Sequence, residues 1–248
     1  VGARTVNNLD GQKYQLTNKK WENTIGVPRT AIEDDAYGMY SNSFAQMGED
    51  AAIHPDDLAF EVLQNGFTDA SGKAFDGQNF FSASHISYSK GSTIEKPKEI
   101  AYSNLQTGSS NPWFLLDLSR TFMRPLIFQM RSEVEFAQLT KPTDPDVFMH
   151  DEFKYGLRAR YNAGYAWYQL AYGSKSPLTA DSYAAARTAM MSQYRPNGRK
   201  AGVKPTHLFY GATNETAVLS LIEAALVNGG NSNIWAKTIT PVLCPWLD

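Results

Sequence analysis

The residues best suited to chemistry are two short runs in which a histidine stands beside carboxylates, His54-Pro55-Asp56-Asp57 and His150-Asp151-Glu152. Imidazole and carboxylate together bind metal ions and transfer protons in hydrolysis. One hypothesis is therefore a metal-dependent hydrolase that uses His54, Asp56, Asp57 and His150. Neither run has the spacing of a known metal motif. A simpler interpretation places His54 at a helix start, where the aspartates suit the helix dipole, and His150 in a turn or at a strand end.

The other reactive side chains lack partners in the sequence. His85 falls in a predicted loop and His207 in a predicted strand, and no triad pattern connects either of them to a serine. Cys244 has no basic neighbour, so we interpret it as a small buried residue rather than a nucleophile. No phosphate-binding glycine loop and no nucleophile elbow occur. The sequence therefore predicts a protein that is not an enzyme, with no catalytic residues, no metal site and no cofactor.

The first predicted element is a β-hairpin over residues 13–32. Tyr14 and Leu16 alternate on one arm, Trp21, Ile25 and Val27 recur on the other, and Asn18-Lys19-Lys20 forms the turn. One face of this hairpin is apolar. A two-stranded hairpin alone is marginally stable in water, so this face covers either the core of its own chain or another chain.

A long helix follows over residues 36–66. Glu33-Asp34-Asp35 precedes it, which suits the positive end of the helix dipole, and Gly66 is predicted as its C-terminal cap. Pro55 leaves two alternatives open, one helix with a kink or two helices in series. The apolar positions recur every three or four residues; they are Tyr37, Tyr40, Phe44, Met47, Ala51, Leu58, Ala59, Val62 and Leu63.

Beyond residue 67 the pattern changes twice. Residues 67–112 are rich in glycine, serine, asparagine and aspartate and predict long loops with short strands. Residues 113–173 have strand character and predict one antiparallel sheet, with strands at 113–117, 126–131, 134–139 and 155–161, the last of which alternates strictly. The last third predicts helices over 180–194 and 214–228 and a closing strand over 239–246.

The composition is that of a folded protein without a strong charge. Of the 248 residues 42% are hydrophobic and 19% charged, and the net charge is −2 with a pI near 6.1. Such a charge disfavours tight nucleic-acid binding. No apolar run reaches the roughly 18 residues of a membrane span. Because the chain starts at Val1-Gly2-Ala3-Arg4 without methionine, we expect a segment upstream.

Several runs spread over the chain resemble one family, the major head subunit of Mu-like phages and prophages, called gpT. The runs that carry the resemblance are residues 14–27, Ile32-Glu33-Asp34-Asp35, Gly38-Met39-Tyr40, Met47-Gly48, Pro55-Asp56-Asp57-Leu58, Asp76-Gly77-Gln78-Asn79-Phe80-Phe81, Trp113-Phe114-Leu115-Leu116-Asp117, Arg124-Pro125-Leu126-Ile127-Phe128-Gln129, Asn162-Ala163-Gly164 and Gly202-Val203-Lys204-Pro205-Thr206. Residues 1–5 look like the middle of a family motif.

The resemblance implies the α+β capsid fold of the Hong Kong 97 type. On this basis residues 1–35 would form an N-terminal segment and an extended-loop hairpin, and residues 36–66 the spine helix. Residues 67–175 would form loops and the peripheral-domain sheet, and residues 176–248 the axial-domain helices and closing strand. In one respect the order departs from most relatives of this fold, because the axial helices follow the peripheral strands.

The same resemblance implies a structural function. The chain would be a homo-oligomer, assembled in the host bacterial cytoplasm, that forms the hexamers and pentamers of an icosahedral virion shell. This shell would enclose double-stranded DNA with weak contacts, without a membrane, and with portal, decoration, scaffold or protease proteins as further partners. An encapsulin-like compartment and the hydrolase remain alternatives. The predicted assembly interface comprises Asn18, Lys19, Lys20, Trp21 and Glu22.

Overall fold

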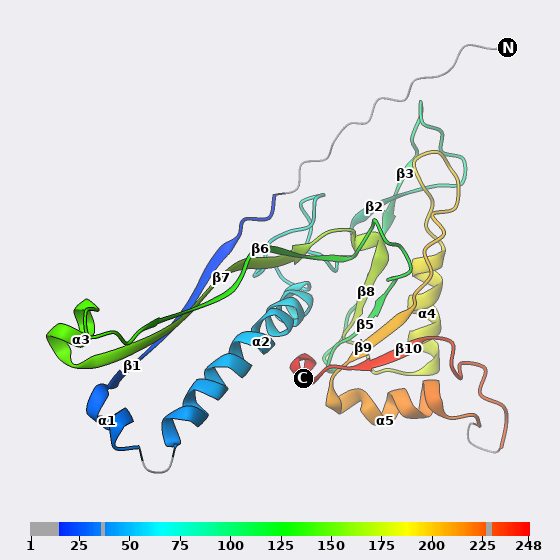
Figure 1. Ribbon diagram of the computed structural model, residues 1–248. Coiled ribbons are helices and arrows are strands. Elements are labelled where there is room, and N and C mark those ends of the chain that lie inside the picture. Colours follow the sequence, from blue (N-terminus) through cyan, green and yellow to red (C-terminus); the bar gives the residue numbers. More distant parts are fainter. Residues whose placement is uncertain (1–14, 36–37, 227–229) are drawn as a thin grey trace.

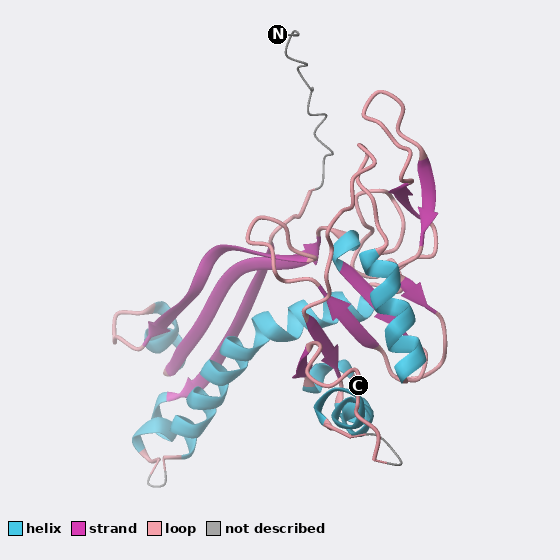
Figure 2. Ribbon diagram, turned by 90° about the vertical axis from the view of Figure 1, so that its right-hand side faces the viewer, coloured by secondary structure: helices cyan, strands magenta, loops and turns pink. Residues whose placement is uncertain are grey.

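The chain forms an elongated arm joined to a compact lobe, as the computed structural model in Figures 1 and 2 shows. The structure describes residues 15–35, 38–226 and 230–248. The arm consists of a three-stranded antiparallel sheet with one long helix along it, and the lobe is built on a five-stranded mixed sheet with helices beside it. A two-stranded sheet extends from the lobe.

The long helix α2 runs from Met39 to Asn65 and confirms the helix predicted over 36–66. Tyr37, one of the predicted apolar positions, lies outside the described residues. The Asp35 carboxylate accepts hydrogen bonds from the amides of Met39 and Tyr40, at 3.0 and 3.1 Å, and satisfies two free donors of the first turn. Pro55 lies inside the helix without ending it, so this segment is one helix and not two helices in series.

The arm sheet has the strand order β1-β7-β6, with β1 at Lys19–Pro28, β6 at Leu126–Leu139 and β7 at Glu152–Tyr165. The predicted hairpin over 13–32 is wrong, because residues 15–18 form no strand and β1 pairs with β7, with Trp21 opposite Ala159. Residues 13 and 14 of that predicted hairpin lie outside the described residues. The hairpin in this sheet is β6–β7, and its loop contains α3 at Pro145–His150.

The lobe sheet has the order β10-β9-β5-β8-β4. Residues predicted as one sheet over 113–173 are divided, because β5 and β8 pair with each other and β5 also pairs with β9, whereas β6 and β7 belong to the arm. Strong alternation predicted the strands but not their partners. The strands of the lobe and of its small sheet are β2 at His85–Tyr88, β3 at Glu99–Tyr102, β4 at Leu105–Gln106, β5 at Trp113–Leu116, β8 at Ala171–Ser174, β9 at His207–Tyr210 and β10 at Thr240–Leu243.

The helices of the last third only partly follow the sequence pattern. Helix α4 at Ala180–Met191 confirms the first prediction, and a capping box between Thr179 and Ser182 fixes its start. The second helix ends at Glu223, before the end of the predicted 214–228, and the amide side chain of Asn233 donates to the carbonyls of Leu221 and Ala224 there. Residues 227 and 228 of that prediction lie outside the described residues. The short helical segments are α1 at Arg29–Glu33, η1 at Tyr168–Leu170, η2 at Ala212–Asn214, α5 at Glu215–Val218, η3 at Leu219–Glu223 and η4 at Pro245–Leu247.

Two buried clusters of apolar side chains hold these parts together. One lies where α2 meets the arm sheet and the lobe and includes Leu63, Phe81 and Tyr165. The other lies between the lobe sheet and its helices and includes Trp113 and Tyr183. The first cluster joins residues of the arm to residues of the lobe, so the two parts are packed against each other. Among the described helices, none is long and apolar enough to cross a membrane.

The division of the chain into peripheral and axial domains stays a prediction. Residues 113–116 and 171–174, placed with the peripheral sheet on sequence grounds, pair in the lobe with strands of the last third. The boundary at residue 175 is therefore not a boundary between sheets. The arm sheet combines β1, which precedes the long helix in the chain, with β6 and β7, which follow that helix.

Candidate assembly surface

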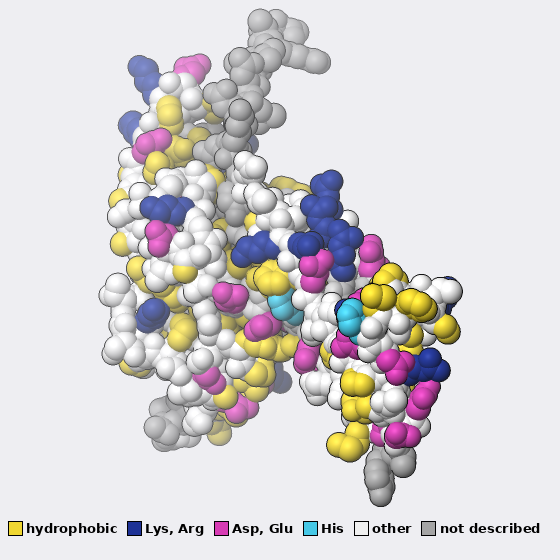
Figure 3. Space-filling model, turned by 90° about the vertical axis from the view of Figure 1, so that its left-hand side faces the viewer, with side chains coloured by type: hydrophobic (Ala, Val, Ile, Leu, Met, Phe, Trp, Pro, Cys, Tyr) yellow, Lys and Arg dark blue, Asp and Glu magenta, His cyan; other side chains and the backbone are white. Residues whose placement is uncertain are grey.

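The far end of the arm exposes a group of large apolar side chains. The loop helix α3 leaves Phe148 78% and Met149 69% exposed, and Phe136 on the neighbouring strand is 57% exposed. Figure 3 shows hydrophobic side chains on this part of the arm. The loop is well fixed, since Lys154 pairs with Asp146 at 2.8 Å and the Lys141 amide donates to Asp144. Apolar surface held out by an ordered loop is typical of a contact with another molecule.

Strand β6 is an open edge of the arm sheet. It pairs with β7 on one side only, and over its length Met130 and Val134 remain 51% and 43% exposed. The pairing register shifts twice in the middle of the strand, between Met130 and Ser132 and between Ser132 and Glu135, as β-bulges do. Bulges at sheet edges twist the edge and limit uncontrolled pairing. The edge and the tip together form a long, partly apolar border.

Of the five residues predicted at the interface, Trp21 packs against the core, whereas three of the other four are exposed at the start of β1. Asn18 precedes β1, and Lys19, Lys20 and Glu22 lie in the first half of the strand, with Lys20 and Glu22 paired at 2.8 Å on the surface. The predicted hairpin turn at Asn18-Lys19-Lys20 is absent, because Lys19 and Lys20 belong to β1. The contact of this segment with a neighbouring subunit stays a prediction.

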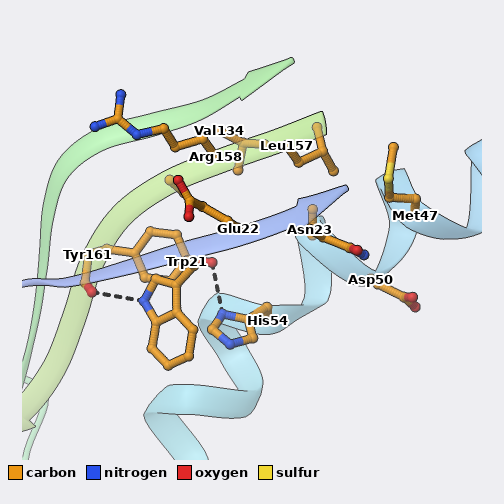
Figure 4. A pocket seen from close by; sticks show the side chains of 12 residues that line it. Trp21, Glu22, Asn23, Met47, Asp50, His54, Val134, Leu157, Arg158 and Tyr161 are labelled. Carbon is orange, nitrogen blue, oxygen red and sulfur yellow. Dashed lines mark hydrogen bonds between the residues drawn. The ribbon is translucent and has the colours of Figure 1, made fainter. Parts of the chain in front are cut away.

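Trp21 instead packs inside its own subunit, as Figure 4 shows. Its indole N–H donates to the Tyr161 carbonyl at 3.0 Å, and its ring meets His54 edge-on with centroids 4.3 Å apart. Burial raises the pKa of Tyr161, so its hydroxyl stays protonated and can donate to His54 Nδ1 at 2.8 Å. These three rings join β1 and β7 to α2.

The residues of the hydrolase hypothesis do not come together. His54 lies in the middle of α2 rather than at a helix start, and its ring faces the arm sheet. Asp56 and Asp57 are exposed, and His150 is the last residue of α3, where it lies 3.9 Å from Asp146. Within residues 15–35, 38–226 and 230–248 no three metal-ligating side chains form a cluster.

Two further reactive groups are buried. Burial raises the pKa of Cys244 to about 11, and its side chain is 1% exposed, in agreement with the interpretation as a small core residue. His85 begins β2 rather than lying in a loop, and it is fully buried, with Nδ1 2.6 Å from Asp76 Oδ2 and Nε2 3.1 Å from the Phe80 carbonyl. The sequence showed no sign of this pair, because its members are connected only by a loop without periodicity.

A long helix along an elongated sheet, joined to a mixed lobe, is the architecture of a shell-forming capsid protein of the Hong Kong 97 type. Solved structures agree with this class. The chain matches the procapsid of bacteriophage JBD30 with 32% identity and a TM-score of 0.77, covering 98% of this chain and 83% of that chain. The match to the bacteriophage JBD30 capsid has 23% identity and a TM-score of 0.81, over 100% and 81%.

Sequence comparisons narrow the class to one family. The family model of the Mu-like prophage major head subunit gpT matches residues 1–247. The major capsid protein of Escherichia phage Mu is 36% identical over 94% of this chain and 76% of the relative. The Mu-like prophage FluMu major head subunit of Haemophilus influenzae is 34% identical over 91% and 73%. The chain belongs to the Mu-like major head subunit gpT family and is a major capsid protein of a tailed phage, a structural protein.

Proposed function

We propose that this chain builds a closed icosahedral shell of hexamers and pentamers that encloses double-stranded DNA. The observation that carries the proposal is the arm, which holds an apolar tip and an open strand edge far from the lobe. A single subunit cannot cover these surfaces, whereas copies arranged around symmetry axes can. The net charge of −2 fits a container that holds DNA with few phosphate contacts.

The same proposal includes the setting of assembly. The shell forms in the host bacterial cytoplasm and becomes part of the virion, and portal, scaffold or protease proteins take part in its assembly. One of the solved relatives is a JBD30 capsid decorated with minor capsid protein trimers, which supports a decoration partner for this shell as well. The family match favours a phage head over an encapsulin-like compartment.

The test is a double substitution at the tip, Phe148→Ser with Met149→Ser. Both side chains are more than two-thirds exposed in the subunit, so the melting temperature should stay close to that of the wild type. Shell yield, measured by sedimentation and electron microscopy, should fall at least tenfold, because each substitution removes apolar area from the contact between subunits.

Ile234→Ser is the matched control, since Ile234 is also 78% exposed but lies in the lobe. This variant should assemble normally. Normal shells from the tip variant would contradict the role of the arm tip in assembly.

A further inference from the structure

The lobe contains a hollow with apolar walls, which we call the cationic hollow because of the residues at its rim. Its volume is about 320 Å³, and it lies between β2, the loop after β5 and the turn after α4. Ile86, Met123, Trp167 and Val203 contribute to its walls. Phe122 at its mouth is 82% exposed. The hollow can therefore receive an apolar side chain from outside.

The side chains that line this hollow include two cations and no carboxylate. Arg120 and Arg195 line it, and the segment 193–206 contributes four cations and no carboxylate. The buried carboxylate of Asp117 lies 3.8 Å from Arg120 and partly balances its charge. Among the residues that the structure describes, Arg195 forms no ion pair. The cations of the two flanking loops are Arg120, Arg124, Arg195, Arg199, Lys200 and Lys204.

Helix α2 carries a patch with the opposite character, which we call the acidic knob. Ile53 is 40% exposed, and its neighbours three and four residues away in both directions are all carboxylates. Positions at these spacings surround a residue on a helix surface. The four carboxylates belong to Glu49, Asp50, Asp56 and Asp57.

Helix α2 itself supplies no counter-charge to the acidic knob, and the nearest cation that shares a pocket with it is Arg158 of β7, which lines the same pocket as Asp50. Helix α2 contains five acidic residues and neither lysine nor arginine. Within the described parts of the chain, none of the four carboxylates around Ile53 forms an ion pair, although Asp50 accepts a hydrogen bond from Gln46 at 2.8 Å. A strip of like charges on one helix face is unfavourable unless a cationic surface covers it.

We propose that the acidic knob of one subunit docks into the cationic hollow of a second copy of this chain. The two surfaces match in both respects, an exposed isoleucine framed by carboxylates and an apolar hollow framed by cations. Ile53 does not line the hollow of its own chain, so the contact joins two copies. This inference rests on the proposed shell function and names the surface by which neighbours in one ring meet.

The contact has a geometric consequence. Knob and hollow are different surfaces, so each subunit uses its knob on one neighbour and its hollow on the other. Such head-to-tail contacts close into rings when the rotation between subunits is a simple fraction of a turn. Hexamers and pentamers are rings of this kind.

The experiment reverses the charge of each surface separately. The hollow variant is Arg195→Glu with Arg199→Glu, at two positions joined by a tight hairpin in which the Arg195 amide donates to the Arg199 carbonyl. The knob variant is Glu49→Lys with Asp57→Lys, at two exposed positions on either side of Ile53. Each variant alone puts like charges together and should lower the yield of hexamers and shells at least tenfold.

Mixing the two purified variants in equal amounts is the decisive step. In an alternating ring every reversed hollow meets a reversed knob and every original hollow meets an original knob, so hexamers should form again. Pentamers have an odd number of subunits and cannot alternate, so the mixture should yield hexamers, tubes or sheets rather than closed shells. Native mass spectrometry and electron microscopy distinguish these products.

A matched control changes the same number of charges elsewhere. Arg131→Glu with Lys141→Glu reverses two exposed cations of the arm. This variant should not bring the knob variant into hexamers. A second measurement on the wild type is the salt dependence, since raising ionic strength from about 0.05 to about 1 M shortens the Debye length and should dissociate the rings.

The outcomes separate this inference from the proposed function. Suppose that the wild type forms shells. If either variant alone then assembles normally, or if the mixture of the two stays unassembled, the knob-and-hollow contact is overturned and the shell function remains intact. A wild-type chain that forms no shell would overturn both.

Discussion

Removal of the Trp21 side chain should weaken the subunit itself. The indole packs against the cluster around α2 and the arm sheet, contacts His54 edge-on and donates to the Tyr161 carbonyl at 3.0 Å. Truncation of a buried tryptophan to alanine costs about 3 to 5 kcal/mol, and Trp21 is only partly buried. The lost hydrogen bond contributes about 1 kcal/mol.

We therefore expect Trp21→Ala to lower the free energy of unfolding by about 3 kcal/mol. For a chain of this size this corresponds to a fall in melting temperature of about 6 to 12 °C. The assay is thermal and urea denaturation of the dissociated subunit, followed by circular dichroism. Trp21→Phe is the matched control, because it keeps a ring beside His54 and loses the indole N–H, and it should cost about 1 kcal/mol.

A change below about 2 °C in Trp21→Ala would refute this reasoning. It would mean that the indole contributes little within the subunit and that the sequence-based expectation, an anchor for a neighbouring chain, explains the residue better. Shell yield at a temperature where the variant is folded separates the two roles.

Three further predictions concern glycines, the cysteine and a buried ion pair. Gly173→Ala should lower the free energy of unfolding in urea by about 1 to 3 kcal/mol, because the added methyl group would lie 2.7 Å from the Phe81 ring. Gly48→Ala, on the open face of α2, is the control and should raise the free energy of unfolding by about 0.5 to 1 kcal/mol, because alanine favours the helix and meets no atom there. Alkylation of Cys244 at pH 8 should be at least tenfold slower in the folded than in the unfolded chain, because burial raises the pKa of the folded thiol to about 11. Above pH 9.0, the ordinary pKa of the thiol, Cys244 ionises more readily in the unfolded chain than in the folded one. Its ionisation therefore lowers the free energy of unfolding as the pH rises. Asp76→Ala should cost about 3 kcal/mol in the same assay, because it leaves the fully buried His85 without its carboxylate; an unchanged urea midpoint would contradict the importance of this pair.

The parts of the fold that sequence reasoning found are those whose pattern is local. Helix α2 shows its apolar spacing over seven turns, and strand β7 alternates strictly from Tyr155 to Tyr161, so both are predicted correctly. A pattern of this kind reports which face is buried and not what covers it. The partner of β1 lies more than 120 residues away, and a nearby turn signal at Asn18-Lys19-Lys20 suggested the wrong one.

The errors near residues 113–173 and 214–228 have similar causes. Strands β5 and β8 are buried on both faces at the centre of the lobe sheet, and their apolar runs do not specify which sheet contains them. The second helix ends early because Asn233, several residues later, binds its last carbonyls. The acidic knob is local and visible in the sequence, but its significance depends on the hollow, whose walls come from segments spread over more than 100 residues.

The most direct test of the central claim is electron microscopy of the purified full-length protein under conditions that permit assembly. The account predicts closed shells of uniform size built from hexamers and pentamers, in which the arm of each subunit contacts its neighbours. A protein that stays monomeric under all such conditions, or that forms only irregular aggregates, would contradict it.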